Sequence, residues 1–253
     1  KVDHIYAIQN AAVALYRIIR QTPGLYPPEQ IHVFIEMAHQ AFQPPMPPTQ
    51  TANFYSAILE ILLELIKQNY QCFLENPPLI QNICGLLSEQ IRTQKGILKC
   101  YDIYFLNGIV DFETQNGRTF TFSTILGAQF VNDLLQCLID IEDPENENPE
   151  DPTDNPPHMA AASALHALFD HNQQEIFNAV KFFYDMHIKS ENWIEIHGSI
   201  YSIIAICTNP NNDPPEPILE FLSFAFPCIV SQAGEPCLNL RTKETSLWII
   251  SKI

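Results

Sequence analysis

Residues 140–157 read DIEDPENENPEDPTDNPP and separate two stretches of helical pattern. Neither lysine nor arginine occurs between Thr119 and Val180, so the negative charge of this segment is not offset nearby in sequence. Repeated like charges do not pack into a core, and the interspersed prolines prevent a helix. The segment is therefore expected to be a solvated acidic loop. Its acidic residues are Asp140, Glu142, Asp143, Glu145, Glu147, Glu150, Asp151 and Asp154.

The sequence on both sides of this loop has the period of amphipathic helices. In the first segment, Ile5, Ile8, Ala12, Leu15 and Ile19 recur at spacings of three and four. Proline-containing stretches such as QPPMPP and NPNNDPPEP interrupt the pattern at intervals. About eleven helices and no convincing strand are expected. They cover residues 2–20, 28–42, 51–68, 79–90, 93–110, 120–139, 159–169, 173–188, 193–207, 217–230 and 240–253.

The helices are expected to form pairs that repeat along the chain. The second helix of each pair begins near residues 2, 51, 94, 159, 193 and 241, in steps of 49, 43, 65, 34 and 48 residues. Most steps lie near the ~40–47 residues of HEAT or armadillo repeats, and the longest contains the acidic loop. The prediction is an all-α fold, a solenoid of five to six HEAT/armadillo-like pairs running continuously over residues 1–253. A compact helical bundle is the alternative.

Small residues in the later helices favour the solenoid over the bundle. Gly198 and Ser199 lie within one predicted helix, and Ser246 and Ser251 lie within another. We expect stacked repeats to approach closely at these positions, because small side chains allow neighbouring backbones to come together. Trp248, in the middle of the last predicted helix, is expected to pack between repeats.

The composition limits the classes of partner. The formal net charge of −16 and the pI near 4.7 disfavour nucleic acid, whose phosphates would be repelled, and favour a basic protein. Seven cysteines without a CxxC pair indicate free thiols and a reducing compartment. No signal peptide is apparent, and no apolar run reaches the ~18 residues that span a bilayer, so no membrane association is expected. The absence of an initiating methionine and the unfinished last helix suggest a fragment of a longer chain.

Three stretches together resemble the importin-β (karyopherin-β) family around its acidic-loop repeat. They are residues 133–169, 180–207 and 240–253, within a well-matching region that spans 131–253. The matching features are Asn155-Pro156 leading into Ala160–Ala162, Asn192-Trp193, and Lys243 to Trp248. Two features depart from the family pattern. Asp154 stands where the family loop has tryptophan, and Ile194, Glu195, Ile196 and His197 replace basic residues.

The resemblance implies a nuclear import receptor that moves between cytoplasm and nucleus through the pore. Such a receptor binds an importin-α-type adaptor or basic cargo on the concave face formed by second helices, where Trp193 and Glu195 are candidates. The GTP form of the small GTPase Ran releases the load, and the eight loop acids are the candidates for contact with Ran or with basic cargo. Phenylalanine-glycine nucleoporins bind between first helices on the convex face. The candidates for that groove are Phe34, Met37, Leu79, Ile83 and Leu86.

Other functions are less consistent with the residues. A calcium loop starting at Asp143 would place Asn148 where the sharp turn needs glycine, and prolines spoil its geometry. The eight histidines show no recurrent metal spacing, no cofactor motif is present, and no nucleophile elbow or P-loop indicates an enzyme. The alternatives are a disordered solvated insertion for the loop and, for the whole chain, a HEAT-repeat scaffold such as a phosphatase regulatory subunit.

Overall fold

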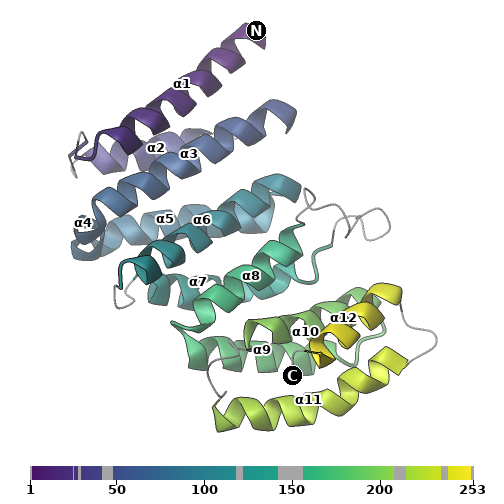
Figure 1. Cartoon of the computed structure of the whole chain (residues 1–253). Coiled ribbons are helices and arrows are strands. Elements are labelled where there is room, and N and C mark those ends of the chain that lie inside the picture. The colour runs from purple at the N-terminus through teal and green to yellow at the C-terminus, as the bar shows by residue number, and fades with distance from the viewer. Residues whose placement is uncertain are drawn as a thin grey trace. The chain divides into compact units, whose positions relative to one another are not determined.

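The structure is a computed structural model, and it describes residues 2–24, 26–27, 30–41, 48–117, 122–141, 156–207, 215–234 and 239–251. Within these ranges every regular element is a helix (Figure 1). The all-α prediction is therefore confirmed. The helices are α1 Val2–Gln21, α2 Ile31–Ala41, α3 Pro48–Gln68, α4 Tyr70–Glu75, α5 Pro77–Thr93, α6 Gly96–Gln115, α7 Phe122–Cys137, α8 Pro157–Phe169, α9 Gln173–His187, α10 Trp193–Ser202, the 3-10 helix η2 Ile203–Ala205, α11 Glu216–Gly234 and α12 Leu240–Ile250.

The chain divides into two compact units, residues 1–122 and 123–253. In the first unit α3 packs between α1 and α6, while α2 packs on α3 and α5 packs on α6. Figure 1 shows α1, α3 and α6 stacked, with α2 and α5 behind them. In this unit the helices expected to be second in each pair form one row.

Helix α4 was not predicted, because its six residues are too few to show a helical period. α3 ends at Gln68, the chain turns at Asn69, and the next six residues form α4. Tyr70 and Phe73 are buried, with their rings 5.6 Å from Phe112 and 6.5 Å from Phe122 respectively, centroid to centroid. The short helix thus closes the first unit with aromatic contacts.

In the second unit α10 packs against α9 and α12, and α11 packs on α12. Gly198 of α10 lies against Leu138 and Ile139, and a Cβ at this glycine would come within 2.8 Å of the Leu138 carbonyl oxygen. Ser199 and Ser246 are fully buried, as expected for close approach. The expectation fails at Ser251, which is exposed.

Two features of the later helices differ from the prediction. The helix expected over 193–207 ends at Ser202 and continues as a single 3-10 turn. Trp248 is 45 % exposed, so it is not buried between repeats as expected. On α12 the inward face is formed by Thr242, Ser246 and Ile249, at spacings of four and three, so Trp248 projects from a neighbouring face.

Candidate binding surfaces

The start of α10 carries the two residues predicted for the concave face. The side-chain oxygen of Asn192 accepts a hydrogen bond from the Ile194 amide at 3.1 Å and caps the helix. Trp193 and Glu195 are both partly exposed in the first turn. This local arrangement leaves an aromatic ring and a carboxylate accessible at one helix end.

Glu195 is held in place by its neighbours while staying accessible. Its Oε2 lies 3.2 Å from Nδ1 of His187, at the end of α9. Hydrogen bonding from Ser190, and then from His187, lowers the pKa of the Glu195 carboxyl. The group is therefore a fixed negative charge at neutral pH.

Two buried histidines lie directly beneath this helix start. The ring of His197 stacks on Tyr201 at 5.6 Å and lies 6.0 Å from the ring of His158. Burial, followed by the positive charges of His197 and Arg241, lowers the pKa of His158 to about 3. Burial and Arg241 lower the pKa of His197 to about 4. Both rings are therefore neutral at physiological pH.

These histidines form an aromatic packing cluster. Nδ1 of His197 has no hydrogen-bond partner among the described residues. The part of the chain that the structure describes contains no group of three or more His, Cys, Asp or Glu side chains arranged to hold a metal ion. The six cysteines in that part are free thiols.

The interior of the first unit contains a second set of buried polar groups. The Tyr55 hydroxyl donates to both carboxylate oxygens of Asp102, at 2.8 and 2.9 Å. Burial raises the pKa of Asp102 well above its usual range although the hydrogen bond from Tyr55 opposes this shift. Burial and the charge of Asp102 also raise the pKa of Tyr55. Both groups lie inside the core, where their hydrogen bonds join α3 to α6.

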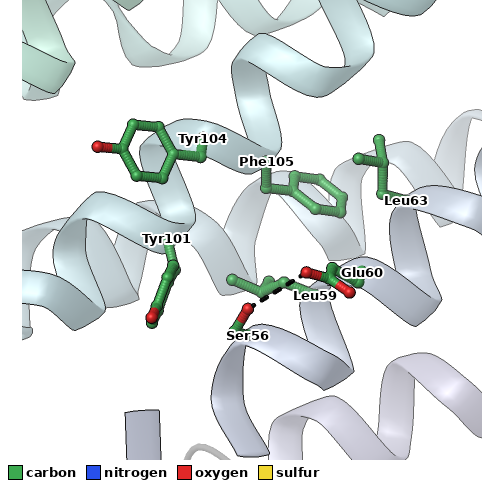
Figure 2. A pocket seen from close by; sticks show the side chains of 7 residues that line it. All are labelled: Ser56, Leu59, Glu60, Leu63, Tyr101, Tyr104 and Phe105. Atoms are coloured by element: carbon green, nitrogen blue, oxygen red, sulfur yellow. Dashed lines mark hydrogen bonds between the residues drawn. The ribbon is translucent and has the colours of Figure 1, made fainter. Parts of the chain in front are cut away.

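A hollow of about 240 Å³ lies between α3 and α6 of the first unit. Figure 2 shows Tyr101 and Phe105 of α6 opposite Ser56, Leu59 and Glu60 of α3. Leu59 and Phe105 are almost fully buried, whereas Glu60 and Tyr104 are exposed. The sequence analysis did not identify this feature, because its lining comes from two helices that are separated in sequence by residues 69–95.

Only the two ends of the acidic loop lie in the described ranges. Asp140 is exposed beyond the end of α7, and Pro156 precedes α8. The other seven predicted loop residues, Glu142, Asp143, Glu145, Glu147, Glu150, Asp151 and Asp154, lie outside the described residues. Their role stays a prediction.

The five predicted nucleoporin-groove residues do not form one exposed set. Met37 of α2 is 42 % exposed and Leu79 of α5 is partly exposed. Phe34, Ile83 and Leu86 are buried in the core of the first unit. Their helical spacing is that of a helix face packed against the core. Of the five predicted residues, only Met37 and Leu79 are accessible to form a groove on α2 and α5.

Exposed apolar side chains are more numerous on the first helices of the second unit. On α9, Phe182 is 68 % exposed and Met186 is also exposed; on α11, Phe224 is 70 % exposed. α9 and α11 are neighbours, since the ring of Phe221 lies 5.4 Å from that of Tyr184. The further exposed apolar residues of α11 are Leu219, Phe226 and Val230.

Helix α11 is also the one helix in the described ranges with the length and apolar composition of a membrane span. The expectation that no apolar segment is long enough to span a bilayer is therefore wrong for this 19-residue helix. Its buried stripe, Ile218, Leu222, Ala225 and Ile229, gives it the inward face of a packed helix, and α12 packs on it. A single such helix is weak evidence for a membrane segment.

Comparison with protein-family models gives no match, and comparison with curated proteins gives none either. Among solved structures, the chain is similar to Kap95p in a study reporting that Kap95p binding induces the switch loops of RanGDP to adopt the GTP-bound conformation. The TM-score is 0.70 at 19 % identity, covering 87 % of this chain and 25 % of that one.

Two further solved structures show the same likeness. A Kap95:Nup1 complex matches with a TM-score of 0.69 at 17 % identity, over 88 % of this chain and 25 % of the other. Importin beta, crystallised in an ammonium sulfate condition, matches with a TM-score of 0.66 at 12 % identity, over 96 % and 30 %. The chain thus has the α-solenoid fold of these proteins, and it spans about a quarter to a third of their length.

Proposed function

We propose that this chain is a stretch of a nuclear import receptor of the importin-β family that acts by binding and not by catalysis. The observation that carries the proposal is the fold match to Kap95p over 87 % of the chain. It coincides with the sequence resemblance at the acidic loop, at Asn192-Trp193 and at residues 243–248. Sequence pattern and backbone geometry therefore both support this family.

The ligand on the second-helix face is, in this proposal, a basic adaptor or cargo segment of the importin-α type. The net charge of −16 attracts Lys/Arg-rich partners over distances set by ionic strength. Glu195 supplies a fixed carboxylate beside Trp193, and the acids of residues 140–154 supply the largest local charge. We assign release of this ligand to Ran in its GTP form, with the acidic loop in contact with Ran.

The first-helix face is proposed to bind phenylalanine-glycine nucleoporins. The solved complex of Kap95 with Nup1 motivates this assignment. In this chain the exposed apolar residues of α9 and α11, including Phe182 and Phe224, fit it better than the predicted residues of α2 and α5, which are mostly buried. Binding on this face would accompany movement between cytoplasm and nucleus, and repeats outside this sequence would complete the Ran and cargo surfaces.

The test is a titration of the 253-residue chain with a fluorescent Lys/Arg-rich helical peptide at about 50 and about 300 mM salt. Two variants with the same net charge, −12 in place of −16, separate a role of the loop from a general charge effect. The first variant carries amides at Glu142, Asp143, Glu145 and Glu147. The second variant carries amides at four exposed acidic residues on helices α4, α5, α9 and α11, which are Glu75, Glu89, Glu175 and Glu220.

Salt-sensitive binding that the loop variant weakens more than the scattered variant would support the proposal. Equal weakening by both variants would remove the specific role of the loop. No binding by the wild-type chain at low salt would contradict a receptor for basic segments and leave a HEAT-repeat scaffold.

A further inference from the structure

The hollow between α3 and α6 has a composition that selects one kind of side chain. Its floor is apolar, formed by Leu59 and Phe105, and Leu63 is also part of the lining. Leu63 lies against Gly108, where a Cβ would come within 2.6 Å of a Leu63 methyl carbon, so the two helices are in close contact beside the hollow. The space is defined by packed helices and not by mobile loops.

Aromatic and acidic groups occupy the more accessible part of the lining. Tyr101 and Tyr104 contribute two phenol rings, and Glu60 contributes the single charged group of the lining (Figure 2). Ser56 donates a long hydrogen bond of 3.5 Å to Glu60, which leaves carboxylate lone pairs available to another donor. At about 240 Å³ the hollow is smaller than the ~300–1,000 Å³ of typical small-molecule sites and suits one long side chain.

We propose that this hollow is a docking site for one arginine side chain of a partner protein. The aliphatic stem lies on Leu59 and Phe105, the guanidinium plane faces the tyrosine rings, and its N–H groups donate to Glu60. Guanidinium groups stack on aromatic faces and pair with carboxylates through two parallel hydrogen bonds, whereas an ammonium group is a compact, strongly hydrated charge. The site therefore favours arginine over lysine. The inference rests on the proposed function only in taking the partner to be a basic protein segment.

The experiment measures binding of a short peptide with one arginine to the full 253-residue chain. All tyrosines are replaced biosynthetically by 3-fluorotyrosine, and the ¹⁹F signals of Tyr101 and Tyr104 are assigned through Tyr101→Phe and Tyr104→Phe. The probe is acetyl-Gly-Ser-Gly-Arg-Gly-Ser-Gly-amide. Matched peptides carry lysine or citrulline, which is a neutral isostere of arginine, at the central position.

The arginine peptide should shift both signals in a saturable way, and the citrulline peptide should shift neither. Glu60→Gln should raise the dissociation constant for arginine about fivefold, since a charged hydrogen-bonded pair becomes a neutral one. The control Glu89→Gln makes the same charge change on an exposed residue of α5, which is not part of the hollow, and should leave the constant unchanged. Unmoved tyrosine signals, equal binding of the lysine peptide, or equal losses in both variants would overturn the proposal.

The outcome separates this inference from the proposed function. Binding of the long basic peptide without any change at Tyr101 or Tyr104, and with Glu60→Gln as active as wild type, would overturn the arginine site and leave the receptor proposal intact. A response to the single-arginine peptide in a chain that does not bind the long peptide would support the arginine site and contradict the receptor proposal.

Discussion

Acid should destabilise the second unit through the buried pair His158 and His197. Both side chains are almost fully buried, and their pKa values are lowered to about 3 and about 4. In the unfolded chain each imidazole titrates near 6.5. Below that pH the unfolded state takes up protons that the folded state does not, so stability is present above about pH 6.5 and falls as the pH is lowered towards 4 and then 3.

The size of this effect follows from the two shifts. Each histidine that titrates only in the unfolded state changes the free energy of unfolding by about 1.4 kcal/mol per pH unit. Between about pH 7.5 and about pH 5, one histidine accounts for about 2 kcal/mol, and the pair accounts for about 4 kcal/mol at most. Arg241 acts in the same direction, because its positive charge opposes protonation of both rings.

The assay is urea unfolding followed by tryptophan fluorescence at these two pH values. Both tryptophans, Trp193 and Trp248, belong to the second unit, so the signal reports the unit that contains the histidines. In His197→Gln the free energy of unfolding should fall by about 2 kcal/mol less than in wild type between these two pH values, whatever the effect of the substitution on stability at neutral pH. The control His166→Gln changes an exposed histidine of α8 and should leave the pH-dependent loss unchanged. The same loss in His197→Gln and wild type would refute the assignment.

Three further outcomes follow from packing and exposure. Gly198→Ala should lower the free energy of unfolding by about 2 kcal/mol in the same tryptophan-fluorescence assay, because the added methyl group meets backbone atoms. Gly85→Ala, with open space around it, should raise the free energy of unfolding by up to about 1 kcal/mol, measured by circular dichroism during urea unfolding because the first unit contains no tryptophan. Tyr55→Phe should lower the free energy of unfolding by about 1–3 kcal/mol near neutral pH, because Asp102 loses a buried hydrogen-bond donor. Urea unfolding followed by circular dichroism measures this change. Phe224→Ser should weaken binding of a phenylalanine-glycine peptide in a fluorescence titration without changing the urea midpoint, because this ring is 70 % exposed. Unchanged peptide affinity in that variant would contradict the proposed role of Phe224 in nucleoporin binding.

The helical architecture could be predicted because its signals are local. The period of apolar residues in α1 and α3, and the prolines between pairs, mark helix boundaries within a few residues of those in the structure. The small residue Gly198 correctly indicated a close approach between backbones, and Ser199 and Ser246 are buried as expected, because small side chains are visible in the sequence. α4 escaped prediction because six residues are too few to establish a helical period.

Exposure was harder to predict than helix position. The pattern that suggested a groove at Phe34, Ile83 and Leu86 is the same pattern that marks an inward face, and these residues are buried. The opposite error occurred at Trp248, whose position among apolar residues in the middle of a helix suggested burial, although the side chain is 45 % exposed. An exposed apolar residue next to a buried one, as with Phe182 beside Phe183, is the pattern that indicates a surface site. Recognising this pattern requires that the buried face of the helix be assigned first.

The four residues after Trp193 show how the fold decides which sequence changes affect the surface. In the family resemblance this stretch is basic, whereas here it reads Ile194, Glu195, Ile196 and His197. Ile196 and His197 are buried, so they contribute to packing beneath the helix. The accessible residues are Ile194 and Glu195, which present an apolar side chain and a fixed carboxylate. A partner docking at this helix start therefore meets a negative group, which favours a basic segment there and disfavours an acidic one.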